Sequence, residues 1–157
     1  AAFGGPIVYG HGEETAKKNL YYFQTQKANE VFEALDGTQR KAALLKKPPR
    51  ESQIPLQGEA GNFPGLGVEQ MTADQKQLVE EVVKLMLAPY RQEDIDEVMQ
   101  IVKAGGGWDQ LHMAFYESND LDGDKMWDIW RVEGPSFVWH FRGAPHVHAY
   151  INIGLAK

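Results

Sequence analysis

The apolar residues of this chain change their spacing once, near the three consecutive glycines at positions 105–107. From about residue 14 to 104 they recur at the spacing of a helix face, whereas from about 108 to 154 they form short aromatic and β-branched runs between turn residues. A helical part followed by a strand part predicts an α+β fold, with about four N-terminal helices packed on a C-terminal four-stranded antiparallel sheet. The length of 157 residues fits a single domain over 1–157.

Four helices are predicted in the first part of the chain, over residues 15–35, 38–45, 72–88 and 93–104. Thr72 and Gln75 have the spacing of a capping box, which places a helix start at this point. Between the second and third helices, residues 47–71 form a stretch rich in Pro and Gly. It is longer than the roughly 12–15 residues usual for a structureless loop in a compact domain, so we expect a functional or crossing segment.

Four strands are predicted in the second part, over residues 111–116, 126–132, 137–142 and 146–153. Asp122-Gly123 favours a type I′ turn, so we expect the first two strands to form a hairpin around it. Alternation in the last strand predicts a core side and a wetter side. The core side would carry Val147, Ala149, Ile151 and Ile153, and the wetter side His146, His148, Tyr150 and Asn152.

Three histidines lie close together in the sequence, His140, His146 and His148. Imidazole is the commonest metal ligand, and two histidines spaced i, i+2 on a strand point to the same side of the sheet. A three-residue connection over 143–145 would pair Arg142 with His146 and His140 with His148, so that all three imidazoles share a face. If Arg142 instead belongs to the turn, His140 points away.

A metal site built on these residues has further candidate ligands elsewhere in the chain. His112 could join from the first predicted strand, His11 from the glycine-rich N-terminal segment, and a carboxylate from Glu117 or Glu133. The chain has no cysteine, so thiolate ligands and disulfides are excluded. Nitrogen and oxygen ligands of this kind suit Zn, Cu or non-haem Fe. The alternative is that the histidines bind no metal and are polar surface or hydrogen-bonded core residues.

Other site classes fit the sequence less well. The net charge of -6 and the scattered basic residues argue against nucleic acid as a partner, and no apolar run has the roughly 20 residues of a membrane span. Asp120, Asp122 and Asp124 resemble part of a calcium loop, but the glycine comes too early and Arg131 stands where the bidentate Glu should fall. An Asp-rich hairpin tip is the favoured interpretation. The start at Ala1, without Met or a charged region, predicts a processed end or a fragment of a longer precursor.

Several short motifs occur in a fixed order: Leu35-Asp36-Gly37-Thr38-Gln39-Arg40 with Ala42, Gly65-Leu66-Gly67 before Met71-Thr72 and Gln75, Trp130-Arg131-Val132-Glu133-Gly134-Pro135, and His146-Val147-His148. In this order the chain, from about residue 3 onward, resembles the C-terminal part of domain-of-unknown-function family 3500 (DUF3500). Its members are typically longer, exported bacterial proteins without an established activity. The resemblance implies a periplasmic or extracellular location and an upstream region, and it assigns no reaction. Family members carry a longer connection before the His-x-His strand, so the short one here favours a tight hairpin.

Three functions compete on this basis. The first is a metal-binding exported protein, whose metal would be catalytic only with an open coordination position. The second is a non-catalytic structural or assembly subunit, in which residues 47–71 and the N-terminus reach other copies of the chain or the upstream part of its own precursor. The third is a carbohydrate-binding module, which requires solvent-facing tryptophans. The candidates for such a platform are Trp108, Trp127, Trp130 and Trp139.

Overall fold

A computed structural model describes residues 3–9, 21–51, 54–144 and 147–155. The helices in this part of the chain are α1 (Tyr22–Ala34), α2 (Gly37–Ala43), α3 (Ala73–Leu87) and α4 (Gln92–Ala104). The strands are β1 (Phe3–Tyr9), β2 (Leu44–Leu45), β3 (Leu66–Gly67), β4 (His112–Tyr116), β5 (Ile129–Gly134), β6 (Phe137–Arg142) and β7 (Val147–Ile153). Short 3₁₀ turns are η2 (Val68–Gln70), η3 (Trp108–Gln110) and η4 (Leu121–Gly123). The α+β class predicted from the sequence is therefore confirmed.

The sheet is larger than the four strands predicted. In the described residues it has seven strands, in the order β1-β7-β6-β5-β4-β2, with β3 pairing β4 beside this path. The predicted antiparallel strands form its centre, as β4 to β7. The prediction missed β1, which pairs antiparallel with β7, and the two-residue β2, which pairs parallel with β4. Strands as short as β2 and β3 carry too few residues for alternation to show, which is why the periodicity did not reveal them.

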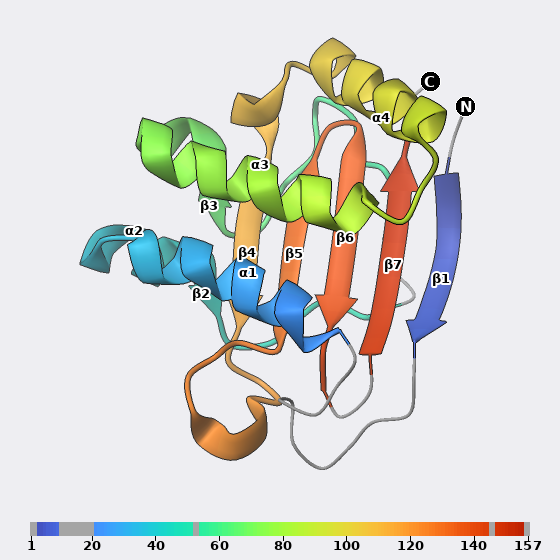
Figure 1. The fold of residues 1–157 in the computed structure, drawn as a ribbon. Coiled ribbons are helices and arrows are strands. Elements are labelled where there is room, and N and C mark those ends of the chain that lie inside the picture. The colour runs from blue at the N-terminus through green and yellow to red at the C-terminus, as the bar shows by residue number, and fades with distance from the viewer. Residues whose placement is uncertain (1–2, 10–20, 52–53, 145–146, 156–157) are drawn as a thin grey trace.

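One face of the sheet is apolar and is covered by the helices, which lie together on that side (Figure 1). Here Trp130 stacks on Phe141 with ring centroids 5.0 Å apart, and the sheet packs against buried residues of α1, α3 and α4. Burial of these side chains is the main favourable contribution to folding. The strand residues on this apolar face are Met113, Phe115, Trp130, Val132, Phe137, Trp139, Phe141, Val147, Ala149, Ile151 and Ile153.

Local capping explains where two helices begin. The Thr72 side chain accepts a hydrogen bond from Gln75 N, and Gln75 Oε1 accepts one from Thr72 N at 2.9 Å, so the predicted capping box is confirmed. A second box, formed by Asp36 and Gln39, starts α2. The Gln75 amide also donates to Ala34 O at 2.8 Å. The start of α3 is thereby joined to the end of α1, and both helices are held over the same face of the sheet.

Two turn predictions need correction. Asp122 and Gly123 do adopt positive φ, 71° and 62°, but they belong to a connection that runs over residues 117–128 and not to a two-residue turn. Neither predicted β6–β7 register is the observed one, because Arg142 pairs with His148 and His140 with Tyr150. The register is shifted by two residues from the tight-hairpin alternative. A shift of two preserves the face, so His140 and His148 lie on the same side of the sheet.

Candidate functional site

The second face of the sheet is polar, and the strand register defines its members. On β7 the alternation of buried and half-buried residues confirms the predicted core and wetter sides. Directly opposed residues of neighbouring strands share a face, so the polar side chains of β4 to β7 gather on the side away from the helices. The polar residues of this face, which also carries Ala114, Ile129 and Val138, are His112, Tyr116, Arg131, Glu133, His140, Arg142, His148, Tyr150 and Asn152.

The proline-rich connection between β2 and β3 crosses this polar face. We call its described residues, 46–51 and 54–64, the strap. In Figure 1 it runs behind the strands, on the side opposite the helices. Of the two roles left open for residues 47–71, a functional loop or a crossing segment, the structure shows that the chain crosses the sheet, and the last residues of this stretch form β3 and η2.

The first part of the strap is tied to the sheet through Glu51. The carboxylate lies 2.8 Å from Arg142 Nε and 3.0 Å from His148 Nδ1, and it accepts a hydrogen bond from the Tyr150 hydroxyl at 3.2 Å. Partial burial raises the pKa of Glu51, but the contacts with His148 and Arg142 outweigh burial and hold the pKa below its ordinary value. Glu51 is therefore ionised at neutral pH and acts as an anchor for the strap.

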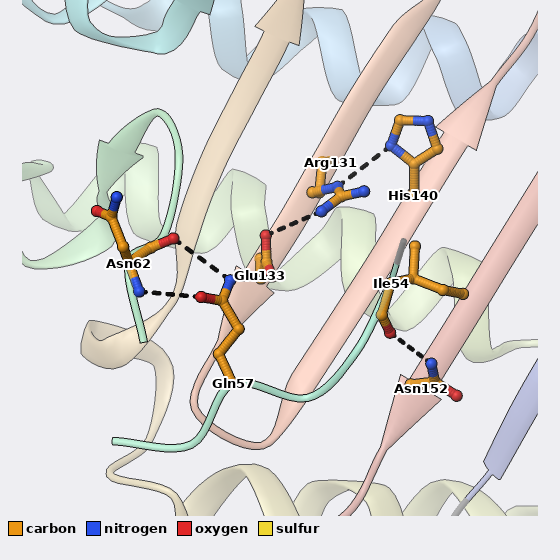
Figure 2. A network of polar contacts seen from close by, with 7 residues as sticks. All are labelled: Ile54, Gln57, Asn62, Arg131, Glu133, His140 and Asn152. Carbon is orange, nitrogen blue, oxygen red and sulfur yellow. Dashed lines mark hydrogen bonds and ion pairs between the residues drawn. The ribbon is translucent and has the colours of Figure 1, made fainter. Parts of the chain in front are cut away.

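The middle of the strap is tied by two side-chain amides (Figure 2). Asn152 of β7 donates to Ile54 O at 2.5 Å, and Gln57 donates to Glu133 Oε1 of β5 at 2.8 Å. The Gln57 amide also closes a turn of the strap, because its Oε1 accepts from Asn62 N at 3.0 Å. These contacts fix the distance between the strap and the strands.

The space between the strap and the polar face is a cavity of about 920 Å³. Its floor is made by Tyr116, Arg131, Glu133 and Asn152. Its apolar wall comes mostly from β2 and the strap. Pockets for small organic molecules in proteins are of this size and are typically apolar with a few polar groups that fix orientation. The apolar lining residues are Leu45, Pro48, Pro49, Ile54, Pro55 and Pro64.

A chain of polar contacts runs from Gln57 through the floor residues Glu133 and Arg131 to His140 (Figure 2). His140 is fully buried in the sheet and does not line the cavity. Arg131 Nη1 lies 3.2 Å from Glu133 Oε2, and Arg131 Nε donates to His140 Nδ1 at 3.2 Å. The side chains of Arg131 and Glu133 are only 4% and 2% exposed. Charges buried to this extent are retained only when they are paired and hydrogen-bonded, which the network provides.

His140 is a neutral imidazole. Burial lowers its pKa to about 3, and the neighbouring positive charge of Arg131 acts in the same direction. Because a guanidinium can only donate, Nδ1 of His140 is the acceptor and the ring hydrogen resides on Nε2. No partner for Nε2 is found among the described residues. The polar face therefore holds a buried N–H donor close to the guanidinium of Arg131.

Tyr116 adds a second polar atom without a partner. Its hydroxyl is buried and has no hydrogen-bond partner in the described residues, and its ring centroid lies 6.3 Å from that of His140. Burial raises the pKa of Tyr116 to about 12. The phenol therefore stays protonated, so a hydroxyl donor lies in the floor of the cavity. A buried polar group of this kind costs free energy unless a water or a ligand satisfies it.

The structure brings together only some of the five histidines predicted as ligands. His140 and His148 share the polar face, with Tyr150 between their rings at centroid distances of 6.5 and 6.3 Å. His112 lies on the same face two strands away from His140, beside Phe63 of the strap. His11 and His146 lie outside the described residues. His148 Nδ1 also lies 2.5 Å from Arg142 Nη2, so this ring nitrogen is engaged.

Metal binding by these histidines stays a prediction. Among the described residues no group of three His, Asp or Glu side chains is arranged to hold a metal ion. The positive charges of Arg131 and Arg142 beside His140 also oppose a cation at that ring. Metal analysis of the purified protein beside a His140→Ala, His148→Ala double variant tests the hypothesis, and equal, near-zero metal in both would contradict it.

The residues that matter most in this cavity were not predicted as ligands of any kind, apart from Glu133 as a metal-site carboxylate. Arg131 and Glu133 have the i, i+2 spacing that places two side chains on one face of a strand, in a run that is otherwise apolar. That signal was available in the sequence. Glu51 had no comparable signal, because its partner Arg142 lies far away along the chain and the two meet only through the strap.

Acid is expected to destabilise the protein through His140. The unfolded chain binds a proton below about pH 6.5, whereas folded His140 accepts one only near its pKa of about 3. Above pH 6.5 the contribution of His140 to the free energy of unfolding is therefore constant. Below that value it falls by about 1.4 kcal/mol per pH unit. Burial raises the pKa of Asp128 from 3.8 to about 7, so Asp128 adds stability at the same rate over nearly the same pH range and offsets most of the loss from His140 in the wild type.

The contribution of His140 can be isolated by comparing the wild type with His140→Gln in urea unfolding between pH 7 and 4. We expect the free energy of unfolding of the wild type to fall steadily, relative to that of His140→Gln, as the pH falls. A difference that stays constant over this range would show that His140 titrates normally in the folded protein.

Comparison with known proteins yields one match. A family model described as a protein of unknown function matches residues 8–151. No curated protein and no solved structure matches the chain. No helix in the described residues is long and apolar enough to cross a membrane.

Proposed function

Since the chain belongs to the DUF3500 family of proteins of unknown function, we propose its function from the cavity: it binds a small organic acid between the strap and the polar face of the sheet. The observation that carries this proposal is the donor-rich floor under an apolar wall. Arg131 and the Tyr116 hydroxyl line the floor and can both donate, and the Tyr116 hydroxyl has no partner in the described residues. Hydrogen-bond donors beside a guanidinium suit an oxygen-rich acceptor such as a carboxylate.

The charge of the lining agrees with one negative charge on the ligand. Lys47 and Arg131 contribute two positive charges and Glu133 contributes one negative charge, which leaves one net positive charge among the lining residues. Glu133 is already engaged by Gln57 and Arg131. A monocarboxylate is therefore favoured over a dianion or a cation.

The apolar wall indicates what the rest of the ligand is like. Four prolines, Leu45 and Ile54 line the cavity. Because proline has no backbone N–H, this wall offers few donors and favours a hydrocarbon or aromatic body. The prolines also restrict the backbone of the strap, so the wall is preformed and less entropy is lost when a ligand binds.

Burial of three of the four tryptophans speaks against the carbohydrate-binding alternative, while Trp108 is half-buried. Trp127, Trp130 and Trp139 are 9%, 0% and 2% exposed, so these rings belong to the core and do not form an open platform. If the cavity binds no ligand, the alternative function is that of a structural or assembly subunit.

The proposal is tested by isothermal titration of matched ligand pairs, benzoate with benzamide and hexanoate with hexanamide. Each pair shares a body and differs in the charged group. We expect the carboxylates to bind at least tenfold more tightly than the amides, which corresponds to about 1.4 kcal/mol. Equal affinity within each pair, or no binding by any of the four, would contradict the proposal.

Tyr116→Phe locates the binding in the cavity. The hydroxyl it removes has no partner in the described residues, so stability should change little. Loss of one hydrogen bond to the ligand should weaken benzoate binding by up to about tenfold. The matched control is Tyr90→Phe, which removes the same atom from a half-buried tyrosine packed against the helix-side core. Benzoate affinity unchanged by Tyr116→Phe would place binding elsewhere.

A further inference from the structure

The connection between β4 and β5 is rich in carboxylates, none of which lines the cavity. It contains four aspartates, Asp120, Asp122, Asp124 and Asp128, with one positive side chain, Lys125. A run of acidic residues in an exposed loop is usually only a solvated surface. The position of its last member distinguishes this loop from that ordinary case.

Asp128 is almost completely buried, at 1% exposure, and it faces back into the loop. Its Oδ2 accepts a hydrogen bond from Leu121 N at 2.8 Å, so the carboxylate lies against the peptide that follows Asp120. Its second oxygen, Oδ1, is buried and has no partner in the described residues. A carboxylate oxygen left in this state is costly unless a proton, a water or a cation satisfies it.

Asp120 presents a second oxygen of the same kind. Its Oδ2 accepts a hydrogen bond from Lys125 N at 3.2 Å, whereas its Oδ1 is buried and has no partner in the described part of the chain. The peptide between Asp120 and Leu121 links the two carboxylates, because the amide at its end binds Asp128. Two unsatisfied carboxylate oxygens therefore occur at the base of one loop.

The backbone that carries Asp128 is held rigidly. Asn29 of α1 accepts from Trp127 N at 2.8 Å and donates to Trp127 O at 3.0 Å, and Gly143 N donates to Asp128 O at 2.7 Å. The backbones of Trp127 and Asp128 are thus both fixed by hydrogen bonds. A ligand that binds Asp128 does not have to order it first, which favours affinity.

We propose that the loop over residues 120–128 binds a hard divalent cation, Ca²⁺, through the free oxygens of Asp128 and Asp120, with Asp122 and Asp124 supplying further oxygen ligands. Ca²⁺ takes six to eight oxygen ligands from carboxylates, backbone carbonyls and water in flexible geometry. The spacing differs from that of a helix–loop–helix calcium site, as the early glycine and Arg131 already indicated. Here one ligand, the buried Asp128, directly precedes β5.

Flexible geometry matters because no three acidic side chains converge in the described residues as they stand. Asp122 and Asp124 are exposed and can rotate towards a cation, while Asp128 and Asp120 provide the fixed part of the site. Mg²⁺ demands near-ideal octahedral geometry and gives up its water reluctantly, so this arrangement favours Ca²⁺. Without a cation, burial raises the pKa of Asp128 to about 7, and the neighbouring Asp120, Asp124 and Asp122 act in the same direction.

The test is a titration of the full chain, stripped with EDTA and dialysed, with CaCl₂ and separately with MgCl₂. Binding heat and the melting temperature are both followed at pH 7.5. We expect one equivalent of Ca²⁺ to bind, with a saturable rise in melting temperature, and Mg²⁺ to bind at least tenfold more weakly. No heat and no shift with Ca²⁺ up to about 10 mM, ten times the weakest constants typical of extracellular calcium modules, would overturn the proposal.

Two variants tie the effect to this loop. Asp128→Asn should abolish Ca²⁺ binding, and Asp120→Asn, a change at a half-buried loop position that keeps the core intact, should weaken it at least tenfold. Asp74→Asn in the first turn of α3 removes the same charge from a distant exposed residue and serves as the matched control. If Asp128→Asn does not fold, the result for Asp120→Asn decides. Unchanged Ca²⁺ affinity in Asp120→Asn would overturn the proposal.

Discussion

Arg131→Met is expected to lower the free energy of unfolding by about 3–5 kcal/mol, the usual cost of removing one partner of a buried ion pair. The substitution leaves the carboxylate of Glu133, which is 2% exposed, with the amide of Gln57 as its one remaining side-chain partner among the described residues. It also removes the donor to His140 Nδ1. An uncompensated charge in a buried position is the physical cause of the loss.

Two comparisons separate this effect from a general loss of packing. In the double variant Arg131→Met, Glu133→Gln no charge remains unpaired, so much of the lost stability should return. Arg91→Met removes an exposed arginine whose partner is Asp94, and we expect it to change stability little because solvent screens the pair. Urea unfolding at pH 7 measures all three variants. A loss below about 1 kcal/mol for Arg131→Met would mean that the pair is not buried as described.

Trp130→Ala, on the opposite face of the same strand, is expected to cost about 3–5 kcal/mol for a different reason. The ring is fully buried and stacks on Phe141 at 5.0 Å. Truncation removes a large apolar side chain and leaves a space that the sheet and the helices over it can fill only in part. The cost therefore comes from lost burial and a cavity, with no charge involved.

Because no titrating group takes part, the loss in Trp130→Ala should be the same at pH 7 and pH 5. Trp108→Ala, at a half-buried position in η3, is the matched control and should cost clearly less. Urea unfolding at both pH values checks the prediction. Equal losses for the two tryptophans would contradict the assignment of Trp130 to the core.

The sequence predicted those parts of the fold that depend on periodicity and local chemistry. Alternation along 147–153 separated the two sides of β7, and the Thr72 and Gln75 pair marked the start of α3. The sequence left two registers open for His140 and His148, and the observed pairing differs by two residues from the one that put both rings on the same face, a shift that preserves the face. The short strands β2 and β3 depend on distant partners, and nothing local in the chain marks them. The apolar run Pro6-Ile7-Val8-Tyr9 indicates an extended segment, but it does not show that β1 pairs with β7.

The candidate site was less predictable because it is made by two segments that meet only in the folded chain. His140 and His148 do lie on the polar face of the sheet. The charges and hydrogen bonds of that face depend on neighbours that are distant in the sequence. His140 is neutral because it is buried beside Arg131, and Glu51 is an anchor because the strap delivers it to Arg142 and His148. Burial and long-range contacts decide these properties, and a pattern of residue types contains neither.

The central claim, a carboxylate site on the polar face, is tested most directly by nitrogen-15 NMR of side-chain N–H groups during a benzoate titration. We expect the signals of Arg131 Nε and His140 Nε2 to shift together and saturate, because Arg131 lines the floor and is hydrogen-bonded to the His140 ring. The indole signals of Trp130 and Trp139, on the helix-covered face, should stay in place. Shifts confined to the indole signals, or no shift of the arginine and histidine signals at saturating benzoate, would contradict the claim.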